Sequence, residues 1–321
     1  MPEPRGLPRT PKRDAWTCAA IIATLSVPAI ATLRTIRIPQ QFVPLKPDPS
    51  PRSYTVSLSL FLVPIAVIAV WFLRHPDHHF ERRAFWRTIG LLVPLGFALD
   101  IFFGTTFFTF PNDRATLGIM IPVVGGAVPI EEFLFYASGF LAVLLGYIWG
   151  NLYWLAAYKV PDYRIESRAL DRIVQFHSPT LLVGVLLIAA GIIYKRFFSP
   201  TPGLLPGYYL FLVVLALTPS LLLFASARPF INWRALSFSF FVLLLVSLLW
   251  EATLASPYRW WGYRDEQMLG LYIYAWCRLP IEAVIVWFAV TYMTVIVYEV
   301  VKIFLAVERP SREALFGLGV R

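Results

Sequence analysis

The sequence has little charge. Only 15% of its 321 residues are Asp, Glu, Lys or Arg, whereas such residues make up about a quarter of a typical soluble protein. Hydrophobic residues account for 58%, and the mean hydropathy is +0.65. This balance excludes an ordinary soluble domain and indicates a chain that crosses a membrane several times.

Other features are scarce or missing, and each absence excludes a class of site. Two cysteines, Cys18 and Cys277, give no disulfide framework. No Gly-x-Gly-x-x-Gly turn joins a strand to a helix, so a dinucleotide site of the Rossmann type is not supported. No Asp-rich repeat is present that would hold a pyrophosphate through Mg²⁺, which disfavours a prenyltransferase. No cofactor is evident from these residues, and the need for a reduced flavin or another factor stays open.

Lysine is rare, and none lies deep within an apolar run. The five lysines stand at or beyond the ends of such runs, at positions 12, 46, 159, 195 and 302. A retinal-type photoreceptor needs a lysine inside a span to form a Schiff base, so that class is disfavoured. The net charge of +9 comes from basic residues between the runs, which suits membrane topology and anionic lipid headgroups better than nucleic acid.

Candidate metal ligands cluster in one place only. His75, Asp77, His78, His79 and Glu81 share the short link after the second apolar run, and a further histidine, at position 177, stands alone at the start of a span. Ligands this crowded in a basic interfacial loop are more often solvated than bound to a metal. We therefore predict no metal site.

Eight apolar runs, separated by proline and charge, predict an all-α polytopic membrane bundle. They cover approximately residues 16–33, 54–73, 86–104, 129–149, 175–194, 205–226, 235–253 and 280–304. We interpret the first run as a membrane span rather than a signal peptide, because it has no clear small-residue cleavage site and further spans follow it.

The charged link at 160–172 divides the chain into two tandem four-span repeats, 1–160 and 161–321, which together form one membrane domain. An even number of spans in each unit predicts that both units cross the membrane in the same direction, related by an axis along the membrane normal. Eight spans place 18 of the 28 Lys and Arg residues on the side of the termini. The chain is thus expected to be a multi-pass protein of the cell membrane with both termini in the cytoplasm.

Acidic residues recur at equivalent places in the two units. Residues 129–132 (Pro-Ile-Glu-Glu) open one apolar run, and residues 280–283 (Pro-Ile-Glu-Ala) open another 151 positions later. Asp100 and Glu251 end the runs before them, at the same separation. Acids at the start of a helix are also common at interfaces, where the helix dipole favours them. Because carboxylates within a membrane are costly without a partner or a use, the duplication favours a functional acid site.

The two units give their acids different neighbours. Glu131 lies beside Glu132 with no cation nearby in sequence, and like charge and apolar surroundings both disfavour the charged form of a carboxyl. Glu282 has Arg278 four residues earlier, on the same face if the helix extends that far. We therefore predict that Glu131 donates a proton, and that Glu282, kept ionised by Arg278, balances or accepts the resulting positive charge.

Aromatic residues surround both motifs. Phe133, Phe135 and Tyr136 follow the first, and six Trp and Tyr residues precede the second, namely Trp260, Trp261, Tyr263, Tyr272, Tyr274 and Trp276. Aromatic faces stabilise cations without attacking them, so an apolar cavity with a proton donor suits a carbocation cascade on a polyene. About half of these residues are expected to anchor span ends at the interface instead. The candidates for substrate contact are Phe133, Tyr136, Trp261, Tyr263 and Trp276.

The stretch 129–136 (Pro-Ile-Glu-Glu-Phe-Leu-Phe-Tyr), preceded by Leu117-Gly118 and by an acid at a span end, resembles the membrane lycopene cyclase domain of two-subunit bacterial and fused fungal enzymes. The resemblance covers both units. It implies an isomerase, an intramolecular lyase of the lycopene β-cyclase type, that closes the ψ-ends of lycopene to ionone rings in carotenoid biosynthesis without net redox change.

The resemblance also implies roles for particular residues. Glu131, Glu132 and Glu282 correspond to the motif acids, and Asp100 and Glu251 match the upstream acid. Three residues depart from the family's pattern: Ala283 stands where a second acid is usual, and Leu99 and Phe110 stand where Trp is more frequent.

Two other functions are left open by the residues alone. One is a membrane terpene cyclase that acts on another polyene or on an epoxide. The other is a membrane transporter or a lipid- or carotenoid-binding protein, since parallel repeats and membrane acids also occur in transporters. The expected partners are lycopene or a related polyene and membrane lipid, without nucleic acid, and the sequence predicts no particular oligomeric state.

Overall fold

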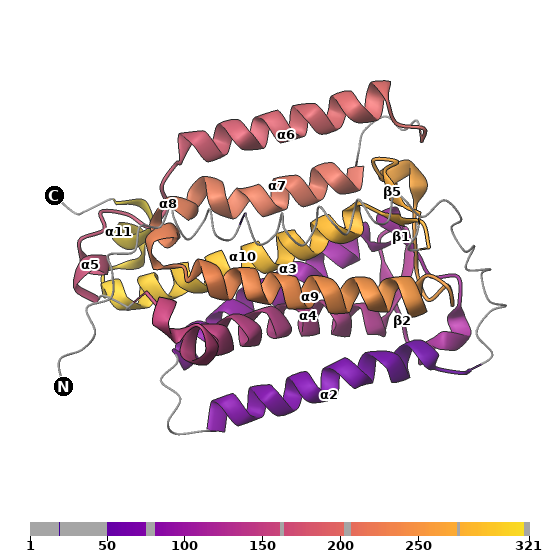
Figure 1. The fold of residues 1–321 in the computed structure, drawn as a ribbon, viewed down its shortest axis with the longest axis horizontal. Helices are drawn as coiled ribbons and strands as arrows, with labels where there is room; N and C mark the ends of the chain where they lie inside the picture. Colours follow the sequence, from indigo (N-terminus) through magenta and orange to yellow (C-terminus); the bar gives the residue numbers. More distant parts are fainter. Residues whose placement is uncertain are drawn as a thin grey trace.

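The computed structural model describes residues 19, 50–74, 81–160, 164–201, 207–274 and 277–317. Within these ranges the chain forms a bundle of helices that run along a common direction (Figure 1). The long helices are α2 (Ser53–Arg74), α3 (Arg82–Phe107), α4 (Ile130–Trp149), α6 (Ser178–Phe197), α7 (Gly207–Leu222), α9 (Trp233–Trp250) and α10 (Glu282–Val307). Helix α4 continues into the π-helical turn η2 (Gly150–Trp154), and α9 continues into η5 (Glu251–Ala255).

The helices coincide with the predicted apolar runs. Six helices of the described residues are long and apolar enough to cross a membrane, and α7 with the bent continuation α8 (Phe224–Ala227) and η4 (Arg228–Phe230) makes a seventh if it counts as one span. The first predicted span, at 16–33, lies outside the described residues, as does most of the histidine-containing link. An eight-span chain therefore stays a prediction, and no metal-ligand cluster is present in the part of the chain that the structure describes.

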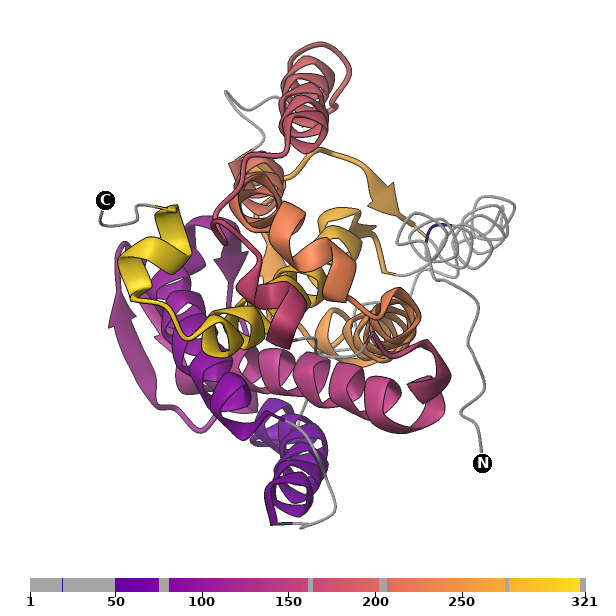
Figure 2. The same ribbon diagram turned by 90° about the vertical axis from the view of Figure 1, so that its left-hand side faces the viewer.

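Helices α4 and α10 form the centre of the bundle, and α2 and α6 lie at opposite extremes of its cross-section (Figure 2). Within the apolar stretch of each helix, about 61% of α10 is buried in the bundle, against 17% of α6. The outward faces of the outer helices carry exposed apolar side chains such as Leu60, Val63 and Leu186. Apolar faces of this extent are stable in lipid rather than in water, which agrees with a membrane protein.

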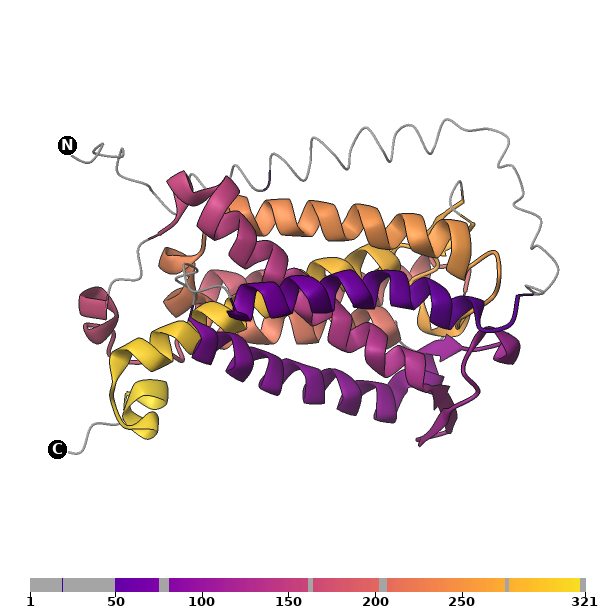
Figure 3. The same cartoon turned by 90° about the horizontal axis from the view of Figure 1, so that it is seen from below.

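Short strands gather at one end of the bundle, beside the acidic motifs (Figure 3). Strands β2 (Met120–Val123) and β3 (Gly126–Pro129) form a hairpin before α4, and β5 (Tyr272–Ile273) and β6 (Leu279–Pro280) pair before α10. Strand β1 (Phe108–Thr109) pairs antiparallel with β4 (Gly262–Tyr263), with Phe108 opposite Tyr263. This last pair joins two segments that are far apart in sequence and fixes the two motif loops against each other.

The order of elements recurs along the chain. Helix α3, strand β1, the turn η1 (Asp113–Ala115), the β2–β3 hairpin and α4 are followed later by α9, β4, η6 (Asp265–Gln267), the β5–β6 pair and α10. A glycine with positive φ follows each 3₁₀ turn, with φ of 79° at Gly118 and 83° at Gly270, a conformation that favours glycine. The recurrence supports two related units, while their extent as four-span repeats at 1–160 and 161–321 stays a prediction.

Helix α6 packs on α7 through glycine, and this contact is testable. A Cβ on Gly191 would lie 2.5 Å from Cε1 of Tyr209, so Gly191→Ala forces the two helices or the ring to shift. We expect the free energy of unfolding to fall by about 1–3 kcal/mol. Gly90→Ala in α3 is the matched control, because its Cβ would meet nothing within 4 Å, and alanine is the better helix former. Thermal unfolding of both variants in detergent measures the difference; equal midpoints would contradict the packing.

Candidate active site

The first acid of each motif is bound to its own preceding loop. Glu131 Oε1 accepts a hydrogen bond of 2.7 Å from the backbone N–H of Leu117, and Glu282 Oε1 accepts one of 2.5 Å from the backbone N–H of Leu269. Both carboxyls are fully buried. A buried N–H without a partner costs about 1–3 kcal/mol. Leu269 is buried, so Glu282 satisfies a group that its loop would otherwise leave unpaired, whereas Leu117 is itself exposed. These two acids hold the loops against the first turns of α4 and α10.

The two anchoring acids differ in their second donor. Thr55 on α2 donates from its hydroxyl to the same oxygen of Glu131, at 2.5 Å. The other oxygen of Glu131 and the other oxygen of Glu282 have no hydrogen-bond partner among the described residues. The two acids thus have similar backbone anchors and different side-chain surroundings.

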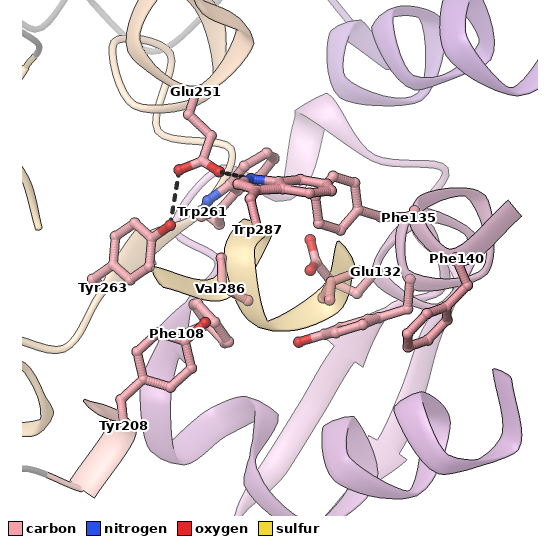
Figure 4. A pocket seen from close by; sticks show the side chains of 13 residues that line it. Phe108, Glu132, Phe135, Phe140, Tyr208, Glu251, Trp261, Tyr263, Val286 and Trp287 are labelled. Atoms are coloured by element: carbon pink, nitrogen blue, oxygen red, sulfur yellow. Dashed lines mark hydrogen bonds between the residues drawn. The ribbon is translucent and has the colours of Figure 1, made fainter. Parts of the chain in front are cut away.

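Two other acids, Glu132 and Glu251, line one shared hollow (Figure 4). Glu132 extends from α4, and its Oε1 accepts a 2.6 Å hydrogen bond from the hydroxyl of Tyr54. Glu251 extends from the end of α9; its Oε2 accepts from the hydroxyl of Tyr263 at 2.8 Å, and its Oε1 accepts from Nε1 of Trp287 at 3.4 Å. The structure thus brings one acid from each half of the chain to the same space.

The wall of this hollow is mostly aromatic. Its lining includes Phe135, Tyr136, Trp261 and Trp287, with the Phe135 ring 5.9 Å from that of Trp261 and 5.6 Å from that of Trp287. The free space inside is about 50 Å³. A second hollow of about 60 Å³ shares part of this lining and extends the apolar space toward α3 and α7; the shared residues are Phe108, Tyr136, Phe140, Tyr208, Val286 and Val290. An elongated apolar molecule fits this arrangement better than a polar one.

Asp100 on α3 is buried, and neither carboxyl oxygen has a hydrogen-bond partner among the described residues. An ionised carboxylate in such surroundings is costly, so Asp100 is favoured in its neutral form. It lies near enough to Glu132 to interact with it electrostatically. Two negative charges this close would repel each other, so ionisation of both acids at once is disfavoured.

The lycopene cyclase family model matches residues 51–149 and 206–301. The chain belongs to the lycopene cyclase family. Each matched segment contains one of the acidic motifs and the acid upstream of it. Membership supports an enzyme of carotenoid cyclisation and implies a polyene carotenoid as substrate. No curated protein and no solved structure matches the chain.

The pairing expected between Arg278 and Glu282 is wrong. Helix α10 begins at Glu282, and Arg278 precedes it with a positive φ of 56°, so the two residues do not share a helical face. The guanidinium of Arg278 forms an ion pair with Asp265 at 3.2 Å and lies over the ring of Tyr272. It therefore lies beside the loop rather than beside the motif acid.

The predicted aromatic residues divide into two groups. Tyr136, Trp261 and Tyr263 line the hollow, whereas Phe133 packs edge-on against Phe97 with centroids 5.1 Å apart and is not part of that wall. Trp276 lies outside the described residues. Other contributors were missed, because Tyr54, Tyr208 and Trp287 reach the site only through tertiary packing and belong to no motif.

Tyr263, in the loop between α9 and α10, remains a hydroxyl donor to Glu251. Burial raises the pKa of Tyr263 well above its ordinary value, and the neighbouring Glu251 raises it further. A phenol that keeps its proton donates to a carboxylate and so favours the ionised form of Glu251. The indole N–H of Trp287 acts in the same direction, because it can only donate.

The anchoring function of Glu282 predicts a difference between two substitutions. Gln retains an oxygen that can accept from Leu269, whereas Ala leaves that buried N–H unpaired, which costs about 1–3 kcal/mol. We expect Glu282→Ala to lower the thermal unfolding midpoint in detergent clearly more than Glu282→Gln does. Asp113→Ala, at an exposed acid of η1, is the matched control and should change the midpoint little. Equal midpoints for all three variants would contradict the anchoring function.

Proposed function

We propose that this chain is a lycopene cyclase that closes the ψ-ends of lycopene to ionone rings by acid catalysis, without net redox change. The supporting observation is that Glu132 and Glu251 line one aromatic hollow, each with different hydrogen-bond partners. In this proposal they take the donor and acceptor functions that the sequence suggested for Glu131 and Glu282, because the latter pair anchors the loops.

Glu132 is the proton donor. Its surroundings are buried and apolar, which makes an ionised carboxylate costly; this outweighs the single hydrogen bond from Tyr54, so a carboxylic acid is favoured. The proton adds to the terminal double bond of the polyene end and leaves a tertiary carbocation. The next suitable double bond attacks this cation, so that one carbon–carbon bond forms and a six-membered ring closes.

Glu251 is the proton acceptor. Two neutral donors, Tyr263 and Trp287, stabilise its anion, so it can remove a proton from the ring cation and leave the ring double bond. One proton enters and one proton leaves, so the reaction is an isomerisation. Transfer of a proton from Glu251 back to Glu132 restores the starting state.

The aromatic wall stabilises the cation between these two steps. The faces of Phe135, Trp261 and Trp287 offer negative quadrupole density and no nucleophilic atom. Because the free space is only about 50 Å³, the polyene end is admitted only as lining side chains move apart. The remainder of the polyene extends into lipid, as expected for a multi-pass membrane enzyme.

Expression of the chain in a lycopene-producing host tests this function. We expect cyclised carotenes in the pigment extract of the wild type. Glu132→Gln and Glu251→Gln should each lose activity by about 10²- to 10⁴-fold, the usual contribution of a general acid or base. Glu81→Gln, at an exposed acid at the opposite end of α3, should behave as the wild type.

Two outcomes would contradict the proposal in different ways. Unchanged lycopene with a folded wild-type protein would exclude the activity and favour a different polyene or a transport function. Full turnover by Glu132→Gln, together with loss in Glu131→Gln, would assign the proton donor to Glu131 instead.

The aromatic wall makes a separate prediction. Phe135→Leu keeps an apolar side chain and removes a π face, so the turnover should fall about 2- to 30-fold, the range expected for loss of one cation–π contact. Phe135→Tyr keeps the ring face and is the matched control. Initial rates with lycopene in lipid vesicles measure both; equal rates for the Leu and Tyr variants would show that the ring does not stabilise the cation.

A further inference from the structure

Helix α6 carries a buried lysine on an otherwise lipid-facing surface. The helix lies at the edge of the bundle, and only 17% of its apolar window is buried, yet Lys195 is 2% exposed. An ionisable side chain at such a place is costly unless it has a partner. The ammonium group of Lys195 is therefore expected to have a polar partner inside the protein.

The ammonium group of Lys195 contacts the second motif loop. Nζ donates to the backbone carbonyl of Met268 and, at 3.1 Å, to the hydroxyl of Thr201. Lys195 forms no ion pair with a carboxylate among the described residues. The ammonium group is thus in direct contact with a backbone carbonyl and a hydroxyl rather than with a carboxylate.

That peptide group leads directly to a motif acid. The carbonyl of Met268 and the N–H of Leu269 belong to the same peptide unit, and this N–H donates to Glu282 Oε1 at 2.5 Å. A cation on the carbonyl polarises the peptide and strengthens its N–H as a donor, since successive hydrogen bonds reinforce one another in a low dielectric. The Lys195 ammonium group, the Met268–Leu269 peptide and the Glu282 carboxylate thus form one hydrogen-bonded row, which links α6 to the start of α10.

The row also reaches the wall of the hollow. Met268 is fully buried and packs in one cluster with Phe107 and Tyr208, against which Tyr263 is also packed. Tyr208 and Tyr263 both line the hollow, and Tyr263 donates to Glu251. A shift of the Met268–Leu269 peptide would therefore disturb a residue that holds the second acid.

We propose that Lys195 is a positioning residue, which fixes the Met268–Leu269 peptide and through it holds Glu282 as a carboxylate. The first motif differs, because Glu131 accepts a hydrogen bond from the neutral hydroxyl of Thr55. The consequence for catalysis rests on the proposed cyclase function, whereas the link itself is measurable without substrate.

Other titratable groups surround this link and define the variants needed. Tyr208 and Tyr209 on α7, and Tyr263 and Tyr272 in the loop, interact with Glu282. Lys195 interacts electrostatically with Glu282 directly, and also with the acids of η6 at positions 265 and 266. The experiment therefore changes Lys195 itself and leaves these groups in place.

Infrared difference spectra of the purified full chain in lipid test the charge. The carboxylate band that Glu282→Gln removes from the wild-type spectrum at neutral pH should also be lost in Lys195→Met, with a protonated carboxyl band in its place. Lys195→Arg should retain the carboxylate band. Lys302→Gln is the matched control, because Lys302 is a largely buried lysine bound to Glu299 by an ion pair of 3.0 Å at the other end of α10. It should leave the Glu282 band unchanged.

Hydrogen exchange tests the position of the peptide. Exchange of the Leu269 amide should rise about 10- to 100-fold in Lys195→Met, as expected for loss of support from a hydrogen bond to a charged group. Lys195→Gln can still donate to Met268 without a charge, so it should keep most of the protection and lose the carboxylate band. If Lys195→Met does not fold, Lys195→Gln decides the question.

The proposal is overturned if a folded Lys195→Met or Lys195→Gln variant retains the wild-type carboxylate band. It is also overturned if the losses of turnover in Lys195→Met and Glu282→Gln multiply in the double variant, because residues that act through one another are not additive. Absence of cyclised pigment in the wild type would refute the cyclase function alone, since the infrared and exchange measurements need no substrate.

Discussion

The structure depends on the hydrogen bond between a buried glutamate and a backbone N–H of the loop before its helix. Burying an ionised carboxyl costs free energy because the group loses its water, and hydrogen-bond donors inside the protein offset that cost. Leu117 supplies one to Glu131 and Leu269 supplies one to Glu282. Because these bonds fix both loops, the next acids and aromatic residues are held in place, and the hollow between the two halves acquires a defined wall.

Much of this arrangement could be predicted from the sequence, and the remainder could not for identifiable reasons. Long apolar runs have few alternatives to helices, so the spans from α2 to α10 were recognisable. Which of two adjacent acids faces the hollow was not, because neighbouring side chains on a helix point about 100° apart, and Glu131 and Glu132 therefore have different surroundings. The expected contact between Arg278 and Glu282 failed because residues 277 and 278 have positive φ and delay the start of α10. Nothing local in the sequence signals the contribution of Trp287.

The two halves are not exact copies of each other, and the positions at which they differ leave one acid of each half at a single shared site. Ala283 is the residue that corresponds to Glu132, and it is fully buried in a small apolar cluster with Leu279. Asp100 corresponds to Glu251, and it has no hydrogen-bond partner among the described residues, whereas Glu251 has two. The two halves thus contribute different members of the acid set to the hollow. Each half gives its acid different hydrogen-bond partners, Tyr54 for Glu132 and Tyr263 with Trp287 for Glu251.

The contact between β1 and β4 joins the two halves at the wall of the hollow. Phe108 and Tyr263 lie opposite each other in this pair, and both line the hollow. Tyr263 is also the donor to Glu251, so a backbone ladder between the halves sets the position of a hydrogen bond in the site. The donor to Glu251 therefore cannot shift relative to Phe108, a wall residue of the other half, without breaking the ladder. A reaction that needs a proton to enter at one point of a polyene and to leave at another requires this kind of rigid separation.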